Sequence, residues 1–136
     1  MLKGINPILN GDLLALLDQM GHSDTVVIAD AHFPAYRISD VVVDVAQGSP
    51  EVTAAVCSVL ELDDVNAVQL MDSEGQALAV QDELVAAAGN PSADRVGLVE
   101  RYAFYEEAKK ANFIIRTTET RIYANVILSK GVTPSS

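Results

Sequence analysis

The chain has 136 residues, 49% of them hydrophobic, which is enough to bury one core and too few for two domains of ordinary size. Nine basic residues against 19 acidic ones give a formal net charge of −10, and such a surface repels nucleic-acid phosphates and anionic lipid. The sequence therefore predicts a single domain over residues 1–136 that binds neither nucleic acid nor membranes and takes a neutral or cationic ligand.

Apolar periodicity and turn residues predict helices and strands that alternate along the chain. The expected elements, in chain order, are a helix from Asn10 or Gly11 to Met20, strands at Thr25–Asp30 and Val41–Val45, a helix from Ser49 to about Leu60, a strand at Asn66–Met71, a helix at Gln81–Ala88, a strand at Arg95–Val99, a helix at Tyr102–Ala111, and strands at Phe113–Arg116 and Tyr123–Leu128. This alternation predicts an α/β fold in which helices flank one sheet.

Capping residues define two of the expected helix boundaries. Gly21 follows the first helix as a C-terminal stop. Ser49 supplies a capping hydroxyl to the second helix, and Pro50 stands at its first helical position. The spacing of that helix buries Val52 and Val59 on its apolar face.

The single cysteine, Cys57, can form no intramolecular disulfide, which is typical of a reducing compartment. Residues Met1–Pro7 lack the long apolar run of a signal peptide, and no stretch approaches the roughly 20 apolar residues of a membrane-spanning helix. We expect a cytoplasmic protein.

Ionisable residues flank the first expected strand. His22 follows the first helix, where the helix dipole favours a cation, and histidine titrates close enough to neutrality to give a proton and take it back. Asp30 and His32 follow the strand, at the edge where open α/β sheets bind ligands. The plainer interpretations are a surface capping histidine and an aspartate that closes a turn. Six extended residues span about 20 Å, so His22 and Asp30 meet only if the fold curls or a neighbouring subunit completes the site.

Two further segments concentrate polar and aromatic side chains. Arg101–Glu106 opens a helix with more aromatic and charged residues than an exposed turn requires, although an amphipathic helix fits the same spacing. Tyr123 and Asn125 enter the last strand and offer uncharged donors and acceptors that suit a polyol. A solvated tyrosine at the start of a strand fits the same residues.

Metal, phosphate and nucleophile chemistry have weaker signals in the sequence. A metal-like grouping of His22, Asp30, His32 and Cys57 has no recognised ligand spacing. The chain has no glycine-rich phosphate loop and no nucleophile elbow. Cys57 lies on the apolar side of a helix, with nothing around it to lower its pKa. We expect no metal and no cofactor.

Five motifs, in order and at compatible spacing, together resemble the family of fucose mutarotases and ribose pyranases. They are Met20–Asp24, Asp30–Ala35, Arg101–Glu106, Tyr123–Asn125 and Lys130–Pro134. The similarity runs from Met1 to Pro134, and it is looser over residues 65–94. The second and third motifs look like the fucose branch.

The resemblance implies that His22 is the proton donor. It also implies that the sugar is bound by Asp30, Arg101, Tyr123 and Asn125, and His32, in the same motif as Asp30, joins this substrate-binding set. Family members assemble into rings or smaller homo-oligomers with sites near subunit contacts, which would bring His22 and Asp30 together.

The expected activity is ring opening and reclosure of a free monosaccharide, with L-fucose as the first candidate. Ala124 stands where fucose enzymes often carry glycine and where the ribose branch tends to carry alanine, so D-ribose pyranase activity is the second candidate. A non-catalytic monosaccharide-binding module and a metal-dependent enzyme that uses His22 and His32 rank below these two.

Overall fold

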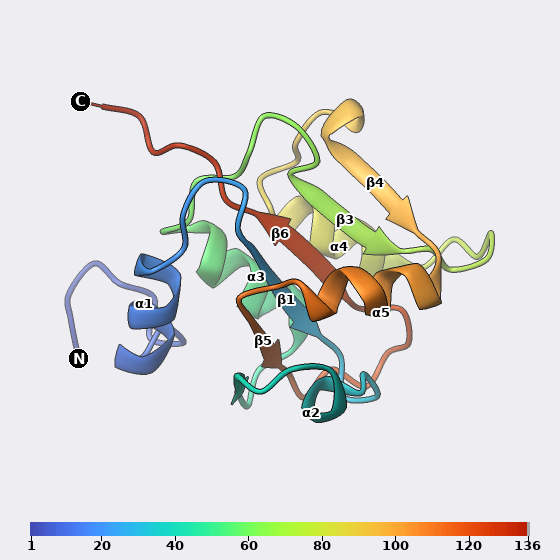
Figure 1. The fold of residues 1–136 in the computed structure, drawn as a ribbon, viewed down its shortest axis with the longest axis horizontal. Helices are drawn as coiled ribbons and strands as arrows, with labels where there is room; N and C mark the ends of the chain where they lie inside the picture. The colour runs from blue at the N-terminus through green and yellow to red at the C-terminus, as the bar shows by residue number, and fades with distance from the viewer. Residues whose placement is uncertain (136) are drawn as a thin grey trace.

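Within residues 1–135, the range that this computed structural model describes, six strands form one mixed sheet and helices cover both of its faces (Figure 1). The strands are β1 (Thr25–Ala29), β2 (Val42–Asp44), β3 (Val68–Met71), β4 (Val96–Val99), β5 (Phe113–Arg116) and β6 (Val126–Ser129). The helices are α1 (Gly11–Asp18), α2 (Ala35–Ile38), α3 (Ser49–Cys57), α4 (Ala79–Ala87), α5 (Arg101–Lys109) and a 3₁₀ turn at Ala93–Arg95. The predicted α/β class, with helices flanking a sheet, is confirmed.

The strand order is β2-β5-β1-β6-β3-β4, and β6 is the antiparallel member. β1 pairs in parallel with β5, and β3 with β4, whereas β6 lies antiparallel between β1 and β3. The carboxyl ends of the five parallel strands therefore meet at one edge of the sheet, together with the amino end of β6.

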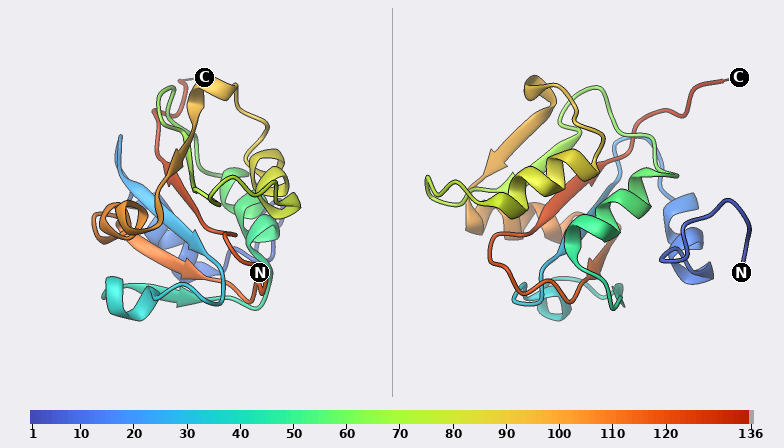
Figure 2. Two further views of the ribbon diagram at one scale, coloured as in Figure 1. Left: turned by 90° about the vertical axis from the view of Figure 1, so that its right-hand side faces the viewer. Right: turned by 180° about the vertical axis from the view of Figure 1, so that it is seen from behind.

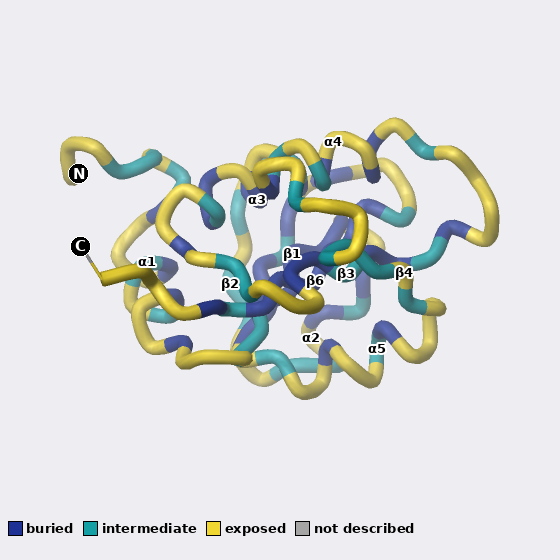
Figure 3. The backbone as a smooth tube through the Cα atoms, turned by 90° about the horizontal axis from the view of Figure 1, so that it is seen from above, coloured by how far each residue is buried: buried dark blue, intermediate teal, exposed yellow. Residues whose placement is uncertain are grey.

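The sheet separates two apolar layers because successive residues of a strand point to opposite faces. Val26 and Ile28 pack with α1, α3 and α4, whereas Val27 and Ala29 pack with α2 and α5. Figure 2 (left) shows α2 and α5 on one side of the sheet and α3 and α4 on the other. β1 and β6 lie at the buried centre, and exposed backbone lies mainly on the helices and loops around it (Figure 3).

Several boundaries differ from the sequence prediction. α1 ends at Asp18, before Gly21, and α3 ends at Cys57, so that Val59 lies beyond the helix and is exposed. The N-cap of α3 is Gly48, not Ser49. The short helix α2, which follows Pro34, was not predicted. In the described part of the chain, no helix is long and apolar enough to cross a lipid bilayer.

Candidate functional site

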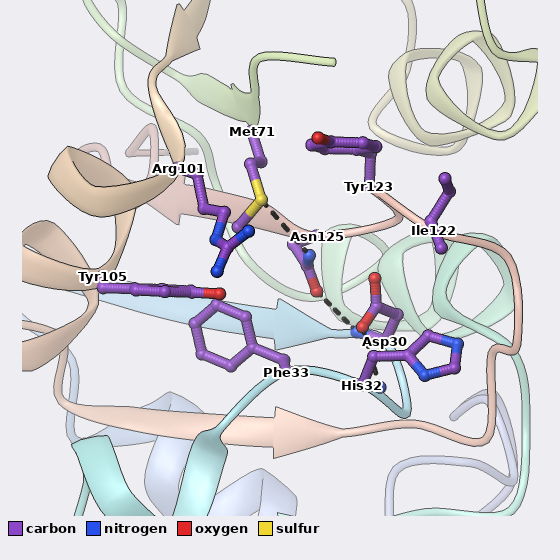
Figure 4. A pocket seen from close by; sticks show the side chains of 9 residues that line it. All are labelled: Asp30, His32, Phe33, Met71, Arg101, Tyr105, Ile122, Tyr123 and Asn125. Carbon is purple, nitrogen blue, oxygen red and sulfur yellow. Dashed lines mark hydrogen bonds between the residues drawn. The ribbon is translucent and has the colours of Figure 1, made fainter. Parts of the chain in front are cut away.

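A cavity of about 360 Å³ opens at the edge of the sheet where the carboxyl ends of the parallel strands meet (Figure 4). Its walls come from the segments after β1 and β4, the end of β3, and the segment that leads into β6. The lining residues are Asp30, His32, Phe33, Met71, Arg101, Tyr105, Ile122, Tyr123 and Asn125. Loops and helix ends leave a crevice at this edge in open α/β sheets, and the cavity lies there as expected.

Asp30 is a buried carboxylate, 2% exposed, that follows directly after β1. One of its oxygens accepts a hydrogen bond from the His32 amide at 3.0 Å and the other from the Ala124 amide at 3.2 Å. Burial raises the pKa of Asp30, and these hydrogen bonds oppose the rise. Asp30 therefore ties the segment after β1 to the segment before β6, with its carboxylate facing the cavity (Figure 4).

Asn125 is held by its amide oxygen, which accepts a hydrogen bond from the Asp30 backbone N–H at 2.7 Å. Its Nδ2 donates toward the sulfur of Met71 at 3.9 Å, which is a weak acceptor. The amide N–H groups are thus oriented at the cavity (Figure 4), where a ligand hydroxyl would be a better acceptor than the thioether.

Tyr123 adopts a left-handed backbone conformation, with φ of 57°. Outside glycine such a backbone costs about 1–3 kcal/mol, so the surrounding structure must hold it in place. Gln81 of α4 does this by donating to the carbonyl oxygens of Tyr123 at 3.1 Å and Met71 at 2.8 Å. The turn aims the Tyr123 ring across the mouth of the cavity (Figure 4).

Arg101 brings a positive charge to the opposite wall, at the first turn of α5. The helix begins there because the Glu100 carboxylate accepts hydrogen bonds from the amides of Tyr102 and Ala103. The guanidinium carbon lies 4.9 Å from the ring centre of Tyr102 and 5.9 Å from that of Tyr105. These aromatic faces support the cation without neutralising it.

His32 lines the cavity at its rim rather than at its centre. Its Nε2 lies 2.9 Å from the carbonyl oxygen of Thr120, and the ring is turned toward the loop that precedes β6 (Figure 4). In this position the imidazole fixes the loop to the segment after β1, and one edge of the ring remains at the cavity.

His22 lies at the other edge of the sheet, because it precedes β1 whereas Asp30 follows it. The five residues of β1 alone span roughly 16 Å. The His22 side chain is 58% exposed, and its Nε2 lies 3.6 Å from an oxygen of Asp63. Within residues 1–135 of one chain, His22 does not line the cavity. The structure thus brings together the five expected binding residues and leaves the expected proton donor outside.

Four cavity residues were not predicted as site residues. Phe33 and Tyr105 lie inside the motifs Asp30–Ala35 and Arg101–Glu106, and their rings pack edge to face at a centroid distance of 5.4 Å. Met71 and Ile122 carry no chemical signal of their own. Met71 could have been found from its place at the end of an expected strand, because that edge of the sheet holds the site.

Metal ligation and thiol chemistry find no support in the geometry. Among the described residues, no group of three His, Cys, Asp or Glu side chains lies close enough together to hold a metal ion. His22 and His32, the pair considered as metal ligands, stand on either side of β1. Burial raises the pKa of Cys57 to about 12, so the thiol stays protonated near neutrality.

The fold and the cavity define a small α/β protein whose ligand site combines one carboxylate, one guanidinium, an amide and a phenol against aromatic walls. This set binds hydroxyl groups and provides apolar contact to a ring. The chain belongs to the RbsD / FucU transport protein family, whose model matches residues 3–133. The family resemblance predicted from the sequence is confirmed.

Individual relatives agree with this assignment. The chain is 40% identical to an L-fucose mutarotase of Glaesserella parasuis, over 98% of this chain and 97% of that protein. It is similar to the crystal structure of the fucose mutarotase of Streptococcus pneumoniae in complex with L-fucose, with a TM-score of 0.90 and 31% identity over 98% of this chain and 100% of the other. The Bacillus subtilis RbsD structure complexed with D-ribose gives a TM-score of 0.79 and 26% identity over 98% and 100% of the two chains.

Proposed function

We propose that the protein is a monosaccharide mutarotase that interconverts the α and β anomers of free L-fucose. The observation that carries the proposal is the convergence of Asp30, Arg101, Tyr123 and Asn125 on one cavity of about 360 Å³, the lower end of the size range of small-molecule sites. The similarity to proteins named L-fucose mutarotase supports the choice of sugar.

The reaction needs two coordinated proton movements and no transfer of electrons. The anomeric hydroxyl loses its proton while the ring oxygen gains one, and the bond from the anomeric carbon to the ring oxygen breaks to give an open-chain aldehyde. The carbonyl carbon rotates, and closure on its other face gives the other anomer. Asp30, Tyr123 and Asn125 hold hydroxyl groups, and the Arg101 guanidinium stabilises negative charge that develops on oxygen.

We further propose that His22 is the general acid and base and that a second copy of the chain delivers it to the cavity. A positioned histidine contributes about 10²–10⁴-fold, equivalent to roughly 3–5 kcal/mol. The exposure of His22 favours delivery by a second copy, as does the exposure of Tyr102 and Ile122 near the cavity. The proposal includes a cytoplasmic homo-oligomer; a single cysteine, which can form no intramolecular disulfide, is typical of a reducing compartment.

Saturation-transfer NMR on free L-fucose tests the proposal, because it measures anomer exchange at equilibrium. We expect the wild type to accelerate exchange, His22→Ala to lose about 10²–10⁴-fold of that acceleration, and Asp30→Asn to lose binding. Lys110→Gln, a change at the exposed C-cap of α5, is the matched control and should keep full activity. Full activity in His22→Ala would remove His22 from the mechanism.

D-ribose pyranase is the second candidate, favoured by Ala124, which is fully buried and donates its amide to Asp30. The ring opening is the same, and only the hydroxyl that recloses the ring differs. Running L-fucose and D-ribose in the same NMR assay separates the two, since the preferred sugar shows the larger acceleration. Binding of either sugar without any acceleration would instead indicate a non-catalytic binding module.

A further inference from the structure

The loop of residues 117–125, between β5 and β6, carries three cavity residues, Asn125 among them, and two charged side chains that do not line the cavity. Ile122 and Tyr123 line the cavity, whereas the side chains of Glu119 and Arg121 point to the helices behind it. We propose that Glu119 and Arg121 are positioning residues that hold this loop, and with it the sugar-binding wall, in register; the consequence for catalysis rests on the proposed mutarotase function.

The Glu119 carboxylate comes from the loop after β5 and is buried against the start of α3. Its side chain is 9% exposed, and a Cβ built on Gly48, the N-cap of α3, would meet Glu119 Oε1 at 2.9 Å. Gly48 offers no side chain to cap the helix, and the Glu119 carboxylate lies beside this N-terminus, where the Ser49 amide is the smallest of the influences that lower its pKa. A residue far along the chain thus stands at the start of α3, and a side chain at position 48 would displace its carboxylate.

Arg121 connects the same carboxylate to a second helix. Its Nε lies 3.0 Å from Glu119 Oε2, and its Nη2 lies 3.1 Å from Glu119 Oε1. The other side of the guanidinium reaches both oxygens of Glu83 on α4, at 2.6 and 3.1 Å. Such paired contacts fix a guanidinium in direction as well as in distance, which a single ammonium contact does not. The hydrogen bonds from Arg121 hold the pKa of Glu119 below its usual range, so Glu119 stays ionised near neutrality.

The backbone of this loop makes the contacts that shape the cavity. The Glu119 carbonyl accepts from the Ala31 amide at 2.8 Å, one residue after Asp30, and the Thr120 carbonyl meets His32. Two residues beyond Arg121, the chain takes the left-handed turn at Tyr123. A shift at Glu119 therefore moves both the segment after β1 and the Tyr123 wall, although neither charged side chain lines the cavity.

The test compares Glu119→Gln and Arg121→Met with Glu107→Gln, a chemically matched change in an exposed ion pair of α5. We expect KM for L-fucose to rise roughly 10–100-fold in the first two variants, with a much smaller fall in kcat, and no change in the control. Arg121→Lys should restore part of the affinity, because an ammonium replaces only some of the guanidinium contacts.

Hydrogen–deuterium exchange supplies a readout that does not depend on the reaction. The amides of residues 119–124 and of Ala31 should exchange at least about tenfold faster in Arg121→Met, while those of β1 and β6 keep wild-type protection. Unchanged exchange in this loop together with unchanged KM would overturn the inference, and so would a uniform loss of protection, which would indicate a general stability role. A wild type that is inactive on fucose would contradict the proposed function alone. The hydrogen–deuterium exchange data would still decide whether Glu119 and Arg121 position the loop.

Discussion

At Asp30, two effects on one carboxyl group act in opposite directions. Burial penalises the charged form, while the amides of His32 and Ala124 and the side chain of Asn125 stabilise it. Burial is the largest cause, so the pKa is raised above the ordinary aspartate value of 3.8. The Asp30 carboxylate, which we propose accepts hydrogen bonds from sugar hydroxyls, is therefore protonated at a higher pH than an exposed aspartate.

The affinity for L-fucose should consequently fall as the solution is acidified, and the fall should begin at a higher pH than an exposed aspartate would give. As pH drops through the raised pKa, Asp30 gains a proton and loses its strength as an acceptor, so 1/KM falls in step with its titration. The carboxyl ¹³C shift of Asp30, followed by NMR against pH, gives the midpoint directly, and the affinity profile should share that midpoint. A midpoint at or below 3.8, or an affinity that does not follow it, would contradict this prediction.

At the scale of elements, the N-termini of α1 and α3 differ in how far the local sequence predicts their capping. The helix α1 was predicted to start at Asn10 or Gly11, and Asn10 is its cap: the side chain accepts from the Leu13 amide at 3.0 Å. Ser49 was predicted to cap α3 in the same way, yet its Oγ is buried and has no hydrogen-bond partner among the described residues. The Glu119 carboxylate stands beside the start of α3, and no local pattern could have indicated a group supplied from so far along the chain.

The two residues should therefore respond differently to alanine. Asn10→Ala should lower the free energy of unfolding by about 1 kcal/mol, because a helix N–H loses its acceptor. Ser49→Ala should leave it unchanged or raise it by up to about 1 kcal/mol, because it removes a buried hydroxyl that has no partner. Urea unfolding at neutral pH measures both. Equal losses in the two variants would show that Ser49 does cap α3.

In the sheet, too, the local sequence predicts the individual strands but not how distant strands pair. β-branched runs predicted the strands, and the end of β1 predicted where Asp30 would stand, while Arg101 was expected only at the start of a helix. The placement of β6 between β1 and β3 depends on pairing between distant segments, and it is this pairing that brings Asn125 beside Asp30. Met71 and Ile122 carry no chemical signal because they supply only shape; the end of its strand could have pointed to Met71, whereas the place of Ile122 appears only after the strands have paired.

At the scale of the whole molecule, the length of β1 answers whether the fold of one chain brings His22 to Asp30. The fold does not curl His22 toward Asp30; it places them at opposite edges of the sheet. A proton donor at one edge can serve a cavity at the other only across a contact between two copies. Such a contact can be reciprocal in a two-fold dimer, in which each copy gives its histidine to the other, or it can close a ring, in which each cavity would take its histidine from a neighbour.

Mixing two inactive variants tests this arrangement. His22→Ala keeps the cavity and loses the donor, whereas Asp30→Asn keeps the donor and damages the cavity. If subunits assemble at random from equal amounts, about a quarter of the sites combine an intact cavity with a neighbour's intact His22, so NMR exchange activity should recover to about a quarter of the wild-type level. Each variant refolded alone at the same total concentration is the control. A co-refolded mixture no more active than its parts would mean that no site draws His22 from one copy and Asp30 from another.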